Sequence, residues 1–348
     1  MNYLLLLLFA LDKAELARID DTVKAAIKSG QAPGAVVVVW HHGKVVYRKA
    51  FGTRAPDEPM TVDTIFDLAS LTKPVATAAA MMKLIEAGKV RLNDPVSKYI
   101  IGFKEGITLE HLLLHTSGLP AGSATSHFES GREEMLKHLV TLSLKAEPGK
   151  KFVYSDLGFI LLGVILEKVV GESLDRFCSK QIFEPLAMSD TTFCPAGTLR
   201  PRIAPTEKGL RGQVHDPRAR VMGGVAGHAG LFGTADDLIK FTEALLADKL
   251  LKPAGTKLFT TPRDVPGGQR TLGWDAKTSY SSNRGTLFAG FGHSGFTGTS
   301  LWIDPPSQTA VIVLTSRLQN MKGNVLKLRS EVATIAAKAV LNKGEPKP

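Results

Sequence analysis

The chain has 348 residues, of which 44% are hydrophobic and 22% are charged, a composition typical of a globular protein with a large core and not of a disordered one. Its formal net charge is +10, but the Lys and Arg residues are scattered and form no dense basic run interleaved with aromatic residues. The sequence therefore excludes nucleic acid as an expected partner, and we interpret the charge mainly as a source of solubility.

The amino end carries an apolar run, from Leu4 to Leu11, that is too short to cross a bilayer but has the length of a signal-peptide core. No basic residue precedes the run and no clean A-x-A cleavage site follows it. Two interpretations stay open: residues 1–11 are a leader and the protein is exported to the periplasm or secreted, or the protein is cytoplasmic. We expect no integral membrane span elsewhere and a single domain over residues 12–345.

Helix and strand patterns alternate at both ends of the chain, whereas the middle is mostly helical. The helical patterns lie at residues 16–27, 70–88, 156–170, 234–247 and 325–341. The strand patterns lie at residues 34–41, 44–52, 271–274, 298–305 and 309–316. His42 and Gly43 separate the first two strands and indicate a hairpin.

This order predicts an α/β (α+β) fold. Residues 12–69 and 270–345 would build one antiparallel sheet flanked by helices, and residues 70–269 would form a mainly helical lobe inserted in the middle. Ligands usually bind in the cleft between such lobes. The two cysteines, Cys178 and Cys194, lack the spacing of a metal site, and they either pair or stay free.

The helical pattern over residues 70–88 places Ser70 and Lys73 three residues apart, so the two side chains would lie on one helix face. Pro74 fits the first turn of such a helix and Gly88 ends it. In one interpretation Ser70 only caps the helix and Lys73 is solvated. In the other, Ser70 is a nucleophile at the positive end of the helix dipole, and Lys73, buried so that its pKa falls, accepts the hydroxyl proton.

Two further segments carry residues suited to the same chemistry. Tyr154 lies just before a predicted helix, where a phenol could pass a proton between nucleophile and leaving group. Near the carboxyl end, glycines surround His293 and Ser294 in the run GFGHSGFTG and allow the backbone to approach a ligand closely. The N–H groups of Ser70 and Phe296 could then form an oxyanion hole. A tyrosine packed at a helix entry and a glycine-rich edge strand are the plain structural alternatives.

In this order, Ser-x-x-Lys, Tyr-x-Asp and His-Ser-Gly resemble the motifs of the serine β-lactamase and penicillin-binding-protein superfamily. The resemblance is to its class C-like branch, which also holds family VIII carboxylesterases and D,D-carboxypeptidase-like hydrolases. It extends over nearly the whole chain: residues 66–100 and 107–120 look like family segments, and residues 214–238 and 292–305 look like the peptidase-related members. The fold that it implies is β-lactamase/transpeptidase-like.

The resemblance also implies catalytic roles. By the family's pattern, Ser70 is the acylated nucleophile, Lys73 accepts its proton and Tyr154 is the second acid/base. The N–H groups of Ser70 and Phe296 would hold the oxyanion. Acylation followed by hydrolysis divides one difficult step into two easier ones.

Two positions depart from the class C pattern. Asp156 stands where class C β-lactamases have Asn, and an ionised carboxylate cannot donate a hydrogen bond to a substrate carbonyl and would hold Lys73 in its charged form. His293 replaces the lysine of Lys-Thr-Gly, which largely removes a fixed positive charge for a substrate carboxylate near pH 7. Both changes favour a neutral ester, or an amide recognised elsewhere, over β-lactams. The expected substrate contacts are these two residues together with Ser294, Gly295 and His215.

No metal or cofactor is expected. His111 and His115 are four residues apart, but no third ligand and no HExxH glutamate accompany them, so we interpret His115 as a helix-end residue that supports the cleft floor. His215 and His228 flank the run GGVAGHAG, which borders the site in the peptidase-like relatives. The sequence has no P-loop, no G-x-G-x-x-G between strand and helix, and no G-x-S-x-G.

The sequence thus predicts a cofactor-free serine hydrolase that cleaves ester or amide bonds of a small-molecule substrate through an acyl-enzyme on Ser70, with carboxylesterase activity as the first expectation. A D,D-carboxypeptidase or class C-like β-lactamase acting on cell-wall peptides or β-lactams is the alternative. A catalytically weak structural or binding member of the fold is a second alternative. The acyl preference and the oligomeric state stay open.

Overall fold

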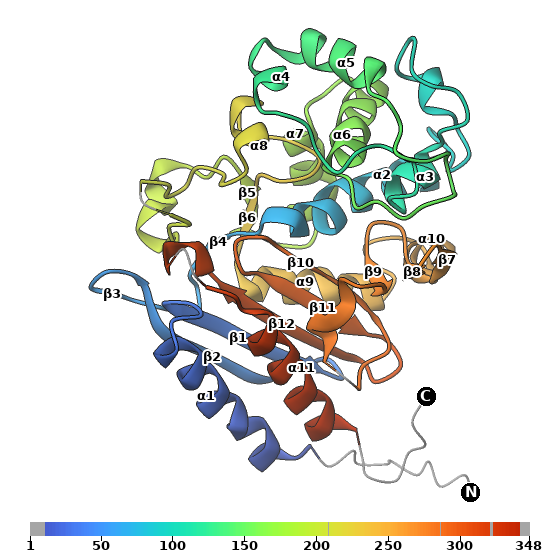
Figure 1. Cartoon of the computed structure of the whole chain (residues 1–348). Helices are drawn as coiled ribbons and strands as arrows, with labels where there is room; N and C mark the ends of the chain where they lie inside the picture. Colours follow the sequence, from blue (N-terminus) through green and yellow to red (C-terminus); the bar gives the residue numbers. More distant parts are fainter. Residues whose placement is uncertain (1–10, 208, 286, 321–322, 342–348) are drawn as a thin grey trace, which may run out of the picture.

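The two ends of the chain meet in one antiparallel sheet. The computed structural model describes residues 11–207, 209–285, 287–320 and 323–341. The sheet strands are β1 (Gly34–His41), β2 (Lys44–Ala55), β3 (Glu58–Pro59), β7 (Arg263–Val265), β8 (Gly268–Arg270), β9 (Asp275–Lys277), β10 (Phe291–Ser294), β11 (Ser300–Asp304) and β12 (Thr309–Thr315). Within the described residues they run in the order β3-β2-β1-β12-β11-β10-β9-β8-β7 (Figure 1). The predicted sheet built from both termini is confirmed.

The turn between β1 and β2 is the tight hairpin that the sequence predicted. His42 and Gly43 have φ angles of 46° and 76°. Two consecutive left-handed residues match the right-handed twist of the strands on either side. The register shifts between Val39, which pairs with Tyr47, and Trp40, which pairs with Val45, so the hairpin carries a bulge two residue pairs from the turn.

Helices cover both faces of the sheet, and for this reason every residue of β1 is buried. Alternate residues of β1 belong to two different cores. Val37 packs with α1 (Lys13–Lys28) and α11 (Leu326–Val340), which lie side by side on one face, while Val38 packs into the core of the other face, where α9 (Ala235–Leu246) lies (Figure 1). A strand covered on both faces has a continuous apolar sequence, and β1 has the sequence GAVVVVW.

The second lobe is mainly helical. Its helices are α2 (Ala79–Glu86), α3 (Leu109–Leu113), α4 (Ser126–Glu129), α5 (Arg132–Thr141), α6 (Asp156–Val170), α7 (Leu174–Cys178) and α8 (Pro217–Val221), and α10 (Pro253–Thr260) follows α9. A small sheet of β4 (Phe66–Asp67), β6 (Leu231–Gly233) and β5 (Thr192–Phe193) connects this lobe to the large sheet. Helix α6 is apolar on all sides and buried from Leu157 to Leu166, so it forms the centre of the lobe.

The segment TLGW, residues 271–274, was expected to be a strand, and this expectation is wrong. It forms the connection between β8 and β9, in which the Thr271 N–H donates to the Trp274 carbonyl at 3.2 Å. Leu272 and Trp274 are fully buried. An apolar turn packed into the core therefore gave the same pattern as a buried strand.

The helix expected over residues 70–88 contains three helix types. A 3₁₀ turn over Ala69–Leu71 is followed by a π-helix over Lys73–Ala78 and then by α2. Pro74 has no N–H to donate to the Ser70 carbonyl, so a regular α-helix cannot run through this point. Short π-helical segments are frequent at functional sites.

Several other expectations concern the ends and the surface. Cys178 is buried and Cys194 is exposed, and both are free thiols. In the described ranges no helix has the length and apolar character needed to span a membrane. Of the leader proposed for residues 1–11, all but Leu11 lies outside the described residues. The domain limits 12–345 remain a prediction.

Gly227 marks a close approach between helix α6 and the segment that follows α8. A Cβ atom at Gly227 would lie 2.0 Å from the carbonyl oxygen of Phe159 in α6. We expect Gly227→Ala to lower the free energy of unfolding by about 1–3 kcal/mol, because the packed backbone must shift. A fall in Tm in a thermal melt would measure this loss. At Gly197 an added Cβ meets nothing within 4 Å, so Gly197→Ala should leave Tm unchanged, and equal losses in both variants would contradict the prediction.

Candidate active site

Ser70 follows a strained turn that leads from β4 into the helix. Ala69 has a φ of 48°, a left-handed conformation that is rare for alanine. Asp67 holds this turn: its Oδ1 accepts from the Ala69 N–H at 2.8 Å, and its Oδ2 accepts from the His215 N–H at 2.7 Å. Burial raises the pKa of Asp67 to about 6, against the opposing effect of the two N–H donors. One carboxyl group thus fixes the turn before Ser70 relative to His215.

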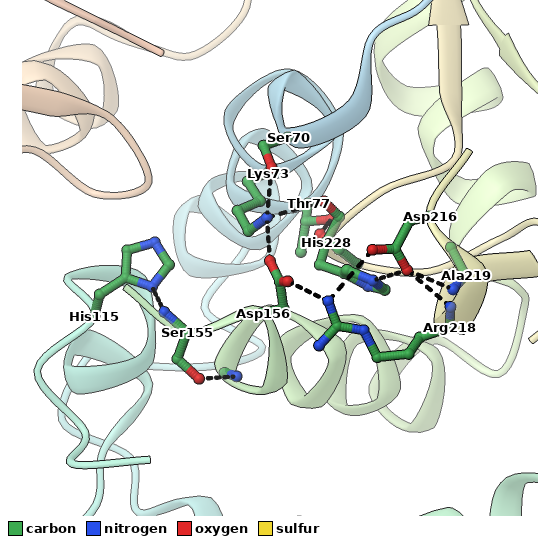
Figure 2. Close-up of polar contacts among 12 residues, drawn as sticks. Ser70, Lys73, Thr77, His115, Ser155, Asp156, Asp216, Arg218, Ala219 and His228 are labelled. Carbon is green, nitrogen blue, oxygen red and sulfur yellow. Dashed lines mark hydrogen bonds and ion pairs between the residues drawn. The ribbon is translucent and has the colours of Figure 1, made fainter. Parts of the chain in front are cut away.

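Lys73 is completely buried and donates to three oxygens (Figure 2). Its Nζ lies 3.1 Å from Ser70 Oγ, 2.8 Å from Asp156 Oδ1 and 3.0 Å from the carbonyl oxygen of His228. Burial lowers the pKa of Lys73, but the negative charge of Asp156 and the neighbouring Tyr154 outweigh it, so the net pKa is raised. Lys73 is therefore an ammonium in this arrangement, the form that Asp156 was expected to impose.

Tyr154 lies beside Lys73, with the Lys73 Nζ 5.0 Å from the centroid of its ring. His115 supports it: the two rings lie 4.5 Å apart, and His115 Nδ1 accepts from the Ser155 N–H at 3.0 Å. Burial and nearby cations lower the pKa of His115 well below its usual value, so its ring is neutral. The expectation that His115 supports the cleft floor agrees with this geometry.

The glycine-rich segment after β10 is bonded to the residues that precede Ser70. Thr297 Oγ1 donates to the Asp67 carbonyl at 2.8 Å, and Thr299 Oγ1 donates to the Leu68 carbonyl at 3.0 Å. Gly295 donates to the Thr299 carbonyl at 2.7 Å and closes the turn. This attachment brings Phe296 close to Ser70, and an oxyanion hole formed by their N–H groups stays a prediction that the connection supports.

A cavity of about 430 Å³ opens beside Ser70. The predicted site residues that line it are Ser70, Tyr154, His293, Ser294, Gly295 and Phe296. Three others lie outside its lining: Lys73 and Asp156 contact each other away from it, and His215 stacks on Phe296 with ring centroids 5.7 Å apart. The structure therefore brings the three motifs to one cavity. Lys73 and His215 contact the wall residues Ser70 and Phe296, and Asp156 lies behind Lys73.

Arg270 is a lining residue that the sequence analysis missed. Its side chain is completely buried, and none of its three guanidinium nitrogens has a hydrogen-bond partner within the described part of the chain. The Asp275 carboxylate lies 3.6 Å from its Nη1, and the Phe152 ring lies 5.3 Å from its Cζ. A lone arginine at the end of a short strand gives no sequence signal of such a role.

His293 was expected to carry little positive charge, and its surroundings agree. Burial, Arg270 and Lys73 together lower the pKa of His293 well below its usual value. The wider expectation that the site lacks a fixed cation does not hold, because Arg270, Arg317 and Arg329 all line the cavity. The positive charge comes from positions outside the third motif.

A chain of charged groups extends from Lys73 into the lobe, and the sequence analysis missed two of its members, Arg218 and Asp216 (Figure 2). Arg218 Nη2 lies 2.6 Å from Asp156 Oδ2 and 3.3 Å from Asp216 Oδ2. Asp216 Oδ1 accepts from His228 Nε2 at 2.9 Å. Asp216 also accepts from two N–H groups at the start of α8. Burial raises the pKa of Asp216, but His228, the Ala219 N–H and Arg218 outweigh it, so the net pKa is lowered.

Asp156, Asp216 and His228 have potential metal-ligating atoms within 4.8 Å of one another. Carboxylates and imidazole suit several divalent ions. The guanidinium of Arg218, however, contacts both carboxylates, so the protein supplies its own cation at this point.

Comparisons with known proteins agree with this geometry. The family model Beta-lactamase matches residues 19–334, and the chain belongs to this family, within the superfamily of serine hydrolases and penicillin-binding proteins. A protein of Escherichia coli O157:H7, provisionally named D-alanyl-D-alanine carboxypeptidase, is 32% identical over 87% of this chain and 82% of its own length. The N-acetylmuramyl-L-alanine amidase of Bacillus subtilis (strain 168) is 30% identical over 87% of this chain and 81% of its own.

Two solved structures are similar over most of the chain. EstCE1, described as a hydrolase with promiscuous acyltransferase activity, has a TM-score of 0.76 and 25% identity, covering 93% of this chain and 99% of its own. The octameric penicillin-binding protein homologue from Pyrococcus abyssi has a TM-score of 0.74 and 26% identity, covering 91% of this chain and 76% of its own. The predicted superfamily and fold are confirmed.

The contact between Asp156 and Lys73 generates a pH prediction. Asp156→Asn removes the negative charge that raises the pKa of Lys73 while keeping an oxygen for its hydrogen bond. The rate of Ser70 labelling by a fluorophosphonate is measured against pH. We expect the acid limb of this profile, where the rate rises as Lys73 loses its proton, to move to lower pH by about one unit or more. Asp236→Asn, which removes an exposed carboxylate paired with Arg48 on the sheet, should leave the limb in place. An upward shift in Asp156→Asn would contradict the assignment.

Proposed function

We propose that the protein hydrolyses esters through an acyl-enzyme on Ser70. The observation that carries this proposal is the 3.1 Å contact between Lys73 Nζ and Ser70 Oγ, made where Ser70 lines a cavity of about 430 Å³. A serine that only caps a helix would need neither a buried lysine beside it nor a cavity. The likeness to EstCE1, a hydrolase, supports the same class of reaction.

In the proposed mechanism, Ser70 Oγ attacks the acyl carbon and its proton passes to whichever of Lys73 and Tyr154 has first given up its own proton. The carbonyl oxygen becomes an oxyanion, which the N–H groups of Ser70 and Phe296 would hold. The leaving alkoxide takes up the transferred proton and departs. Water then attacks the acyl-enzyme, the acid is released and Ser70 regains its proton.

The cavity lining supports an ester with an apolar acyl chain. Trp302, Val325 and Leu326 contribute apolar surface on the side of the sheet and α11. The low pKa of His293 keeps that residue neutral, so it contributes no charge to attract a carboxylate. Apolar walls with a few polar groups are typical of small-molecule sites.

A second candidate function is hydrolysis of an amide that carries a carboxylate, as in a D,D-carboxypeptidase. Arg270 favours it, because a buried guanidinium with no hydrogen-bond partner among the described residues suits a carboxylate, which can accept two parallel N–H bonds. The carboxypeptidase and amidase names of the two curated relatives point to the same bond type. Asp156 argues against strong β-lactam turnover, since it cannot donate to a substrate carbonyl.

Ser70→Ala tests the nucleophile. Intact-mass spectrometry after treatment with a fluorophosphonate should show one adduct on the wild-type protein and none on Ser70→Ala, because only the wild type has the Oγ that forms the bond. Ser123→Ala is a matched control on the helical lobe and should still be labelled. An unlabelled wild-type protein that also fails to hydrolyse a panel of esters would overturn the proposal and favour a structural or binding role.

Arg270 separates the two candidate substrates. Because loss of Arg270 alone would leave Asp275 buried without its cation, we combine Arg270→Met with Asp275→Asn. If the substrate carries a carboxylate, the KM for a D-Ala-D-Ala peptide should rise about 10- to 100-fold, the loss of a charge-assisted hydrogen bond, while a neutral p-nitrophenyl ester changes little. If only the ester is turned over, and the double variant hydrolyses it as the wild type does, the carboxylate-dependent candidate fails.

A further inference from the structure

We propose that Arg218 is a positioning residue that shares the Asp156 carboxylate with Lys73, and that it thereby sets the pH above which Lys73 can accept the proton of Ser70. This inference rests on the proposed function, since it needs Ser70 to be a nucleophile. It concerns the segment HDPRA, residues 215–219, to which the mechanism above assigns no task.

The geometry divides the Asp156 carboxylate between two cations. Its Oδ1 faces Lys73 Nζ at 2.8 Å, and its Oδ2 faces Arg218 Nη2 at 2.6 Å. Asp156 is the first residue of α6, and its own N–H donates to the Ala121 carbonyl at 2.9 Å, so its position is set by the backbone. The carboxylate therefore lies between a base that must lose a proton and a guanidinium that never does.

Arg218 is itself held in place by Asp216. Asp216 Oδ2 lies 3.3 Å from Arg218 Nη2, and Asp216 Oδ1 accepts from His228 Nε2 at 2.9 Å and from the first N–H groups of α8. The imidazole of His228 is 1% exposed, and its backbone carbonyl accepts from Lys73 at 3.0 Å. A closed loop of contacts thus returns from Lys73 through two carboxylates and two basic residues to Lys73 (Figure 2).

The charges explain why an arginine is needed at this point. Lys73 with Asp156 alone is a tight buried ion pair, in which the ammonium is favoured and a base is unavailable near neutral pH. The positive charge of Arg218 partly cancels the negative potential of Asp156 at Lys73, and so weakens the attraction that holds the proton on Lys73. Asp216 balances Arg218, so the four charged groups sum to zero in the interior.

The groups that face this pair come from several elements. Tyr154 precedes α6, His115 follows α3, and His293 lies on β10. The charge of Lys73 contributes to the lowered pKa of both histidines, which are neutral and add no charge of their own. On the side of Asp156, His228 and Arg218 both lower the pKa of the carboxyl, together with Lys73. Among these neighbours Arg218 is the permanent cation in direct contact with Asp156, so it has the largest expected effect.

The test measures the second-order rate of fluorophosphonate labelling against pH. Arg218→Met should move the acid limb up by about one pH unit, which lowers labelling at pH 7 about tenfold and leaves the plateau at high pH unchanged. Arg218→Lys should restore most of the wild-type profile. This shift is opposite in sign to that expected for Asp156→Asn, because one variant removes a cation next to Asp156 and the other removes Asp156 itself.

The matched control is Arg202, which also bridges two aspartates, Asp63 at 2.9 Å and Asp190 at 2.7 Å, but has no contact with the Lys73 network. Arg202→Met should label with the wild-type pH profile. If Arg218→Met does not fold, Arg218→Met with Asp216→Asn removes a cation and an anion together and keeps a residue that caps α8. Loss of the Asp216 charge offsets part of the effect, so this double variant should show a smaller upward shift than Arg218→Met.

The outcomes separate the two proposals. A wild-type protein that is not labelled overturns the proposed function, and this inference with it. A labelled wild type whose Arg218 variants lose rate equally at every pH, or show no shift, overturns the inference alone and leaves Arg218 with a structural role. A labelled wild type with an upward shift in Arg218→Met and none in Arg202→Met supports it.

Discussion

The buried ammonium of Lys73 is the constraint on which the rest of the site depends. A charge removed from water costs several kcal/mol unless it is paired and hydrogen-bonded. Three separate segments supply its acceptors: the turn of Ser70, the start of α6 with Asp156, and the carbonyl of His228. Ser70 is close to Lys73 in the sequence, whereas Asp156 and His228 lie 83 and 155 positions after it. Satisfying one ammonium therefore fixes the relative placement of much of the helical lobe.

The expectations that succeeded from sequence rest on local patterns. The hairpin at His42 and Gly43, helix α6 and helix α9 each depend on residues within a few positions, and all three are present. The motifs around Ser70, Tyr154 and His293 could be assembled because their order and residue types resemble one family. The failure at residues 271–274 has a local cause as well, since an apolar turn and an apolar strand have the same composition.

The residues that sequence reasoning missed act through contacts distant along the chain. The sequence around Arg270 does not indicate a role for it. The role follows from the fold, because β8 places Arg270 at a cavity that is also lined by Ser70, 200 positions earlier. Arg218 and Asp216 lie in a segment that resembles the peptidase-related members, but the sequence alone assigned them no role. Asp156, which contacts Arg218, comes from another helix. The family relationship supports the proposed nucleophile and base, whereas the substrate is expected to depend on the residues of the cavity wall, because one fold hosts different functions.

The pairing of β1 with β12 has a consequence for how the protein is made. Strand β1 forms its ladder with residues 309–315, which lie far along the chain from it. The turn after β10 that is bonded to the residues before Ser70 is also synthesised long after Ser70 itself. Until residues 309–315 emerge from the ribosome, a nascent chain exposes apolar residues of β1 without this partner, and long-range pairing of this kind closes slowly. Ser70 is therefore translated early, but the cavity beside it is complete only after its late-synthesised lining residues have folded against it.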